Sequence, residues 1–162
     1  MDAVTRQNLT SSDQQEWATP DDLYAALNEE FNFQLDAFAS PENFKCDTFF
    51  TPEENALVLP WSPGPVFANP PYGKLLPQCV RKAHAEFLTG ITVVLLVPAR
   101  TDTAWWRYCL DGEIRFIDGR LRFNGSKNSA TFPSVVVVLG DAYPSKIGRG
   151  YNVVGGKLVG RV

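Results

Sequence analysis

The residues best suited to chemistry are four consecutive ones, Asn69, Pro70, Pro71 and Tyr72. They follow the short apolar run 66–68, which is typical of a buried strand. Neither proline has a backbone N–H and each fixes φ at about −65°, so the strand must stop at a stiff corner. The carbonyls of such a corner have no competing N–H donors. An amide oxygen, carbonyls and a phenol ring held there are suited to accept hydrogen bonds from an amino group, although a Pro-Pro turn alone is usually only a loop.

The elements around this corner alternate between helices and strands. The helix expected over 20–31 has Thr19 as a good N-cap and Pro20 at its first position. Apolar patterns predict a further helix over 74–87, the start of another at 103–108, and strands over 33–39, 46–51, 66–68, 91–97, 113–118, 120–123 and 135–139. The near-continuous apolar run 91–97 indicates a strand covered on both faces. This alternation, with 44% hydrophobic residues, predicts a globular α/β chain.

Length and composition limit the class of protein. The 162 residues fit one domain with a sizeable core. No apolar run of about 18 residues exists, which excludes a membrane span, and residues 1–6 lack the apolar segment expected of a signal peptide. Three widely spaced cysteines indicate reduced thiols, and the only histidine, His84, lacks a metal-ligating cluster. We therefore expect a cytoplasmic protein with neither a membrane nor a metal partner.

The charge is unevenly distributed along the chain. The net charge is −3, but residues 1–60 carry twelve acids against Arg6 and Lys45. Residues 113–162 instead carry an excess of arginine and lysine. One face can therefore meet phosphates although the whole molecule is anionic. The alternative is a solvated surface with a chance asymmetry.

Several short sequence motifs occur in an order that resembles one enzyme family. They are WATP at 17–20, LDAFA at 35–39, NPPYG at 69–73, VPARTDTAWW at 97–106 and GRLRF at 119–123. Together they resemble the phage-type Dam-like DNA N6-adenine methyltransferases, which use S-adenosylmethionine (S-adenosyl-L-methionine). The similarity spans roughly residues 17–140.

The resemblance implies a fold and a domain organisation. The expected fold is a compact, three-layer, Rossmann-like S-adenosylmethionine-dependent methyltransferase fold with a mixed, mostly parallel sheet. We expect a flexible N-terminal arm over 1–15, the methyltransferase domain over 16–140, and a basic, glycine-rich tail over 141–162.

The resemblance also implies a catalytic role for each residue of the corner. The Asn69 side-chain oxygen and the Pro70 carbonyl accept hydrogen bonds from the N6 amino group of adenine. Pro71 keeps the corner rigid, and Tyr72 stacks on the flipped base. The amine then becomes a better nucleophile without a strong general base.

Asp36 is the leading residue for the cofactor, because an acid at the carboxyl end of a parallel strand is placed where open α/β sheets bind nucleosides. Phe49 or Phe50 is expected to pack on an adenine ring, and Asp47 or Asn55 to hydrogen-bond ribose or adenine. Each of these four could equally be a turn or core residue. The cofactor residues predicted in full are Trp17, Thr19, Pro20, Asp36, Ala37, Phe50, Asn55 and Asn69. The turn 39–43 departs from the larger methyltransferases, because it contains no glycine.

Four residues are predicted to contact nucleic acid: Arg100, Arg122, Lys127 and Phe132. The resemblance places the polar loop 124–134 against the target base, and alternating arginines near 120–123 are suited to phosphates. Arg100 could instead only pair with Asp102, and the loop could be a flexible hairpin.

The sequence therefore predicts a DNA adenine-N6 methyltransferase, located in the host cytoplasm if phage-encoded. Alternatives are methylation of another planar amino group, in RNA adenine, cytosine N4 or protein glutamine, or a nucleic-acid-binding module of the same fold without catalysis. The missing glycines favour that module, and the intact residues 69–72 oppose it. No target-recognition domain is visible, so sequence preference must come from short loops, from the partner in a homodimer, or be weak.

Overall fold

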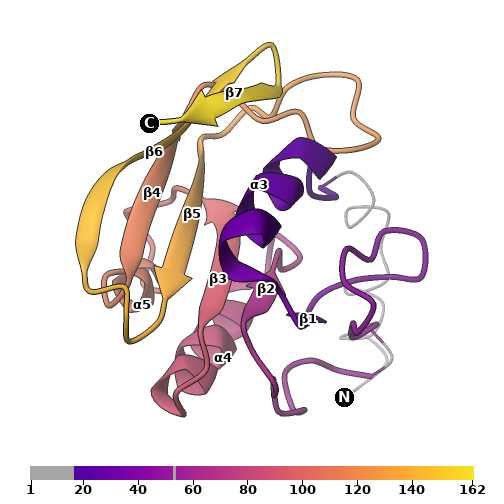
Figure 1. Cartoon of the computed structure of the whole chain (residues 1–162), viewed down its shortest axis with the longest axis vertical. Coiled ribbons are helices and arrows are strands. Elements are labelled where there is room, and N and C mark those ends of the chain that lie inside the picture. The colour runs from indigo at the N-terminus through magenta and orange to yellow at the C-terminus, as the bar shows by residue number, and fades with distance from the viewer. Residues whose placement is uncertain (1–16, 53) are drawn as a thin grey trace.

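The computed structural model describes residues 17–52 and 54–162 (Figure 1). The expected arm over 1–15 lies outside these residues. The helices are α3 (Asp21–Phe31), α4 (Leu76–Leu88) and α5 (Trp106–Cys109). The strands are β1 (Leu35–Asp36), β2 (Val66–Ala68), β3 (Val93–Pro98), β4 (Glu113–Asp118), β5 (Ser134–Leu139), β6 (Lys146–Val154) and β7 (Lys157–Arg161).

The described strands form one curled, mixed sheet in the order β1-β2-β3-β5-β4-β6-β7. The α/β class and the mixed sheet are therefore confirmed. The expectation of a mostly parallel sheet is wrong, because β1, β2 and β3 pair in parallel, as do β4 and β6, while the other neighbours are antiparallel. β5 lies antiparallel between β3 and β4, and a short hairpin joins β6 to β7, which requires opposite directions.

Helices lie on both faces of this sheet (Figure 1). Along β3, Val93, Leu95 and Val97 belong to a buried cluster with residues of α4 and α5. Val94 and Leu96 belong to another cluster, with residues of α3. The prediction that the strand within 91–97 is covered on both faces is thus confirmed.

Three predicted strands are shorter or absent in the described chain. The strand expected over 33–39 is only Leu35–Asp36, and 46–51 contributes a single bridge, from Phe49 to Asp36. Residues 120–123 pair with no named strand. Leu121 and Phe123 alternate with exposed arginines because both are buried in the α3-side cluster.

The segment 141–162 adds two strands to the sheet. β6 pairs with β4, and β7 closes the edge beyond it. Tyr151 and Val153 are buried among the α3-side cluster. This part of the chain therefore packs with the rest, although its sparse apolar residues indicate a separate tail.

Parallel pairing brings the candidate site residues Asp36 and Asn69 to one end of the sheet. Asp36 is paired with Phe67, and Ala68 with Leu95. Asn69, which follows Ala68, and Asp36 therefore come together at the carboxyl ends of neighbouring strands, the usual ligand-binding edge of such sheets. No helix in the described chain is long and apolar enough to cross a membrane.

Candidate active site

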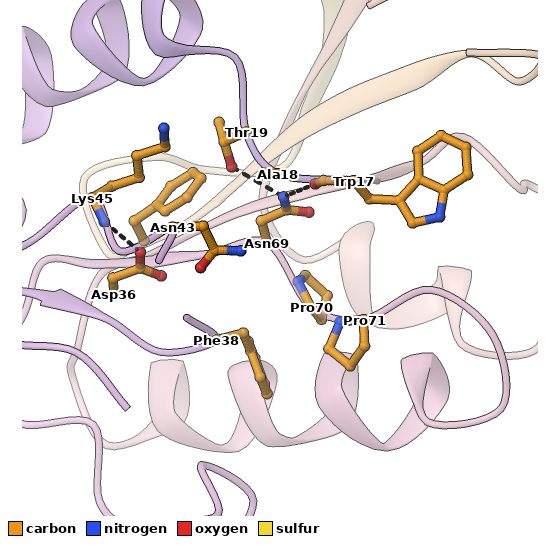
Figure 2. Close-up of a pocket in the computed structure, with 11 residues that line it drawn as sticks. Trp17, Ala18, Thr19, Asp36, Phe38, Asn43, Lys45, Asn69, Pro70 and Pro71 are labelled. Atoms are coloured by element: carbon orange, nitrogen blue, oxygen red, sulfur yellow. Dashed lines mark hydrogen bonds between the residues drawn. The ribbon is translucent and has the colours of Figure 1, made fainter. Parts of the chain in front are cut away.

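The Asn69 amide is held in one orientation by its nitrogen. Asn69 Nδ2 donates to the carbonyl of Trp17 at 2.7 Å and to Thr19 Oγ1 at 3.0 Å (Figure 2). A carbonyl can only accept, so the amide nitrogen must face Trp17 and the amide oxygen must face elsewhere. Asn69 Oδ1 is buried and has no hydrogen-bond partner within the described residues.

Thr19 has a different role from the one expected for it. Helix α3 begins at Asp21 with Pro20 in the cap position, and no side chain caps it. The prediction of Thr19 as N-cap and Pro20 as the first helical residue is therefore wrong. The buried Thr19 hydroxyl instead accepts from Asn69, so the strand carrying the corner is tied to the start of the helix.

The rest of the corner is rigid and poor in donors. Pro70 and Pro71 are both buried. Among the described residues, no backbone N–H donates to the carbonyl of either proline. The Pro70 carbonyl is thus left able to accept from a ligand, as the sequence predicts.

Tyr72 lies in an aromatic cluster that we define as Trp17, Tyr72, Phe123 and Phe132. Its ring is 6.0 Å from Trp17 at an interplanar angle of 33°, and it meets Phe123 and Phe132 edge-on at 6.2 and 5.6 Å. Its hydroxyl donates to the Leu96 carbonyl at 3.4 Å. Burial raises the pKa of this phenol, so it stays neutral. The ring is fixed for stacking and not for proton transfer.

Asp36 presents a second acceptor that lacks a donor. Asp36 Oδ2 accepts from the backbone N–H of Lys45 at 3.0 Å. Asp36 Oδ1 is buried and has no partner in the part of the chain that the structure describes. Burial raises the pKa of this carboxyl to about 7, against the opposing effects of the nearby Lys45 and Phe38 backbone N–H groups and of the Lys45 charge.

Asn69, Thr19, Asp36 and the two prolines line one cavity, whose lining does not include Tyr72 (Figure 2). It is bounded by residues from the start of the described chain, from the ends of β1 and β2, and from the loop between them. They are Trp17, Ala18, Thr19, Asp36, Phe38, Asn43, Lys45, Phe67, Asn69, Pro70 and Pro71. Two buried acceptors without donors, in one cavity, fit a ligand that brings donors.

A second cavity adjoins the first, with Phe38 in the lining of both. It is lined mainly by apolar groups and includes Ala37, Phe50 and Asn55. Phe49, the alternative to Phe50, instead stacks on Phe44 at 4.5 Å outside both cavities. Such a slot is suited to a flat apolar ring with a polar edge.

The structure brings together most, though not all, of the residues predicted for the site. Of the predicted cofactor residues, only Pro20 lines neither cavity. Arg100 lies over the Phe132 ring at 5.9 Å, beside the aromatic cluster. Arg122 and Lys127 are exposed and line neither cavity.

Sequence reasoning missed Phe38, Asn43, Lys45 and Phe123. Asn43 Oδ1 accepts from the Ser40 N–H at 2.7 Å, which closes the turn that lacks glycine. A side-chain hydrogen bond thus stabilises this turn, and the sequence signal for it is an asparagine three residues after a serine. Lys45 contributes its backbone N–H to Asp36, and Phe123 contacts the Tyr72 ring. Neither contact can be predicted from the residue type alone.

Asp21 connects two loops that border the site. Its Oδ1 accepts from Lys45 Nζ at 2.5 Å and from Asn124 Nδ2 at 3.0 Å. Lys45 and Asn124 together lower the pKa of Asp21. The backbone N–H of Asn124 also donates to the carbonyl of Ala18 at 2.9 Å. The loop after β1 and the loop before β5 are thereby both attached to the start of α3.

No group of three or more His, Cys, Asp or Glu side chains that could hold a metal occurs within the described residues. The absence of a metal partner stays a prediction. The fold and the cavity define an α/β protein whose ligand site lies at the carboxyl ends of parallel strands, the class in which nucleoside ligands bind.

The chain belongs to the DNA N-6-adenine-methyltransferase (Dam) family, whose model matches residues 6–144. It is 35% identical over 109 residues to the DNA N-6-adenine-methyltransferase of Haemophilus phage HP1, covering 66% of this chain and 63% of that protein. It is 36% identical over 93 residues to the enzyme of the same name from Escherichia phage T1, covering 56% of this chain and 38% of that protein. The matches thus span less than two thirds of either relative. The predicted resemblance to the phage enzymes is confirmed.

Proposed function

We propose that this protein transfers a methyl group from S-adenosylmethionine to N6 of an adenine flipped out of DNA. The observation that carries the proposal is the Asn69 amide, whose nitrogen is bonded twice while its buried oxygen has no partner in the described chain. Membership of the DNA N-6-adenine-methyltransferase family supports the same reaction.

The lining of the two cavities supports the proposed cofactor. S-adenosylmethionine carries an amino group and ribose hydroxyls, which are donors for Asp36 Oδ1, and an adenine ring for the slot of Ala37, Phe50 and Asn55. A Rossmann-like, three-layer methyltransferase fold belongs to the same proposal, because α3 and α4 pack on opposite faces of the sheet.

The corner acts on the amino group of the target base. The N6 lone pair is delocalised into the adenine ring, so the nitrogen is a poor nucleophile until it becomes more tetrahedral. Asn69 Oδ1 and the Pro70 carbonyl accept hydrogen bonds from the two N6 hydrogens and so favour that change. Both acceptors are preorganised, one by the bonds to Trp17 and Thr19 and the other by the proline ring.

S-adenosylmethionine, when bound, supplies a methyl carbon that accepts the N6 lone pair, while the sulfur keeps the electrons of the broken S–C bond. The nitrogen becomes positively charged and then loses one proton to solvent. Asn69 Oδ1 and the Pro70 carbonyl stabilise the charge before the proton leaves. Tyr72 holds the base, because its ring is fixed by the aromatic cluster.

The predicted nucleic-acid contacts belong to this proposal as well. Phe132 lies edge-on to Tyr72, and Arg100 lies over Phe132, so both border the place where a flipped base would stack. Arg122 and Lys127 are exposed cations that can contact phosphates farther out. The partner is therefore proposed to be DNA.

The test is methyl transfer from labelled S-adenosylmethionine to unmethylated DNA, RNA or protein, each offered separately to the purified protein. We expect label in DNA, located at N6 of adenine by digestion to nucleosides and mass spectrometry. DNA that is already methylated at N6 is the control and should accept little label. Label only in RNA or protein, or at another position of DNA, would reject the proposal.

A further inference from the structure

The turn of the β6–β7 hairpin lies beside the start of α3 and the loop that precedes β5 (Figure 1). Its two residues, Gly155 and Gly156, both have positive φ. The backbone N–H of Leu158 donates to Asp22 Oδ2 at 2.8 Å, which attaches β7 to the first turn of α3. The hairpin is therefore fixed to the same helix end that is tied to the catalytic corner.

Two close approaches join the hairpin to segment 119–122. A Cβ at Gly156 would lie 2.4 Å from the Cβ of Arg122, and one at Gly119 would lie 2.0 Å from the carbonyl oxygen of Val153. Only glycine permits backbones to come this near, and the positive φ of each position also favours it. The backbone of Arg122 is thus packed directly on the hairpin turn.

Arg122 also adjoins the aromatic cluster. The next residue, Phe123, is buried and meets Tyr72 edge-on and Trp17 at 5.3 Å. One residue therefore separates the hairpin turn from a ring in contact with the catalytic tyrosine. Groups on this turn have fixed positions relative to the site.

Three cations on this surface are left without acidic partners. Arg120, Arg122 and Lys157 are exposed and form no ion pair within the described residues. Two basic side chains of the hairpin are neutralised, since Arg149 pairs with Asp118 and Arg161 with Glu30. We call Arg120, Arg122 and Lys157 the hairpin cations.

We propose that the hairpin cations bind the phosphates of the duplex that flanks the target adenine. The inference rests on the proposed function and extends it, because segment 119–122 and the start of β7 would give the protein a second contact with DNA outside the base pocket. Contacts to phosphates position a protein on the duplex without reading its sequence. The packing of segment 119–122 on the hairpin turn is suited to this, since it fixes the backbones that carry these cations before DNA binds.

The test compares two lysine variants with the same loss of charge. Lys157→Ala removes a hairpin cation, whereas Lys146→Ala, the control, removes an exposed lysine from the opposite end of β6, where it is paired with Glu113 in the sheet register. We expect Lys157→Ala to weaken DNA binding about threefold to tenfold and to reduce the salt dependence by about one phosphate contact. The loss should be the same on unrelated DNA sequences, and S-adenosylmethionine binding should not change.

A double variant, Arg120→Ala with Lys157→Ala, should lower the salt dependence further than Lys157→Ala does. Equal salt dependence in wild type and both Lys157 variants would overturn the inference, as would an equal effect of Lys146→Ala. These results are distinct from failure of the proposed function. In that case the wild-type protein itself transfers no methyl group to DNA.

Discussion

The direction of the Asn69 oxygen follows from the chemistry of its neighbours. The Trp17 carbonyl cannot donate, so the amide must present its nitrogen there and its oxygen to the cavity side. An acceptor buried without a donor costs free energy in the folded protein. Asn69 Oδ1 and Asp36 Oδ1 both have this property, and a ligand with donors removes the cost.

Asp36 makes the site sensitive to pH. Burial raises its pKa from 3.8 to about 7, so the folded protein favours the protonated form. The resulting stabilisation is complete below the ordinary pKa and is lost as the pH rises through about 7. The ionised carboxylate is the better acceptor, so binding of S-adenosylmethionine should strengthen over the same range.

We therefore expect wild type to lose free energy of unfolding, relative to Asp36→Asn, as the pH is raised from 3.8 to about 7, with little further loss above that. Urea unfolding at several pH values across that range measures this effect. Calorimetric titration should show cofactor affinity rising with pH in wild type and flat in Asp36→Asn. If the two proteins had the same pH dependence in both measurements, Asp36 would not titrate in this range.

At the level of elements, the hairpin glycines allow a matched comparison. Gly155 and Gly156 both have positive φ, but a Cβ at Gly155 meets nothing within 4 Å, whereas one at Gly156 lies 2.4 Å from the Arg122 Cβ. Gly155→Ala should cost about 1 kcal/mol for conformation alone. Gly156→Ala should cost about 2–3 kcal/mol because it also moves Arg122.

Denaturant unfolding of both variants measures this difference. Gly156→Ala should also weaken DNA binding more than Gly155→Ala does, because Arg122 is displaced. Equal stability of the two variants would show that the hairpin turn does not pack on segment 119–122.

How well each helix or strand could be predicted depends on whether its own residue types determine it. Continuous apolar runs identified the strands within 91–97 and 135–139, because a strand that is buried on both faces has apolar residues at consecutive positions. The direction of β5 could not be predicted, since strand direction depends on connections and not on composition. β6 and β7 were missed because backbone hydrogen bonds hold them and their residues are largely exposed.

The site divides in the same way. The position of Asn69, Pro70, Pro71 and Asp36 in one cavity was predictable, because these residues follow or end neighbouring strands. The contribution of Lys45 comes from its backbone N–H to Asp36, which any residue but proline could supply. Thr19 was assigned to the helix cap, since sequence alone does not show that Asn69 lies within reach of its hydroxyl.

At the scale of the molecule, several acidic side chains form ion pairs, while some exposed basic side chains do not. The net charge of −3 opposes DNA binding in general. Glu30 and Glu113, however, are paired with the buried Arg115, and Asp21 with Lys45. These acids are already neutralised within the protein, while the hairpin cations are not. A negative molecule can therefore present a locally basic surface to phosphates.

The central claim is that the Asn69 oxygen receives the amine that is methylated. The most direct measurement is the single-turnover rate of N6-methyladenine formation in DNA by wild type and by Asn69→Ala, with S-adenosylmethionine and DNA both saturating. Loss of a preorganised acceptor predicts a rate about 10²- to 10³-fold lower in the variant, with circular dichroism and cofactor binding preserved. A folded, cofactor-binding Asn69→Ala protein that methylates adenine at the wild-type rate would contradict the account.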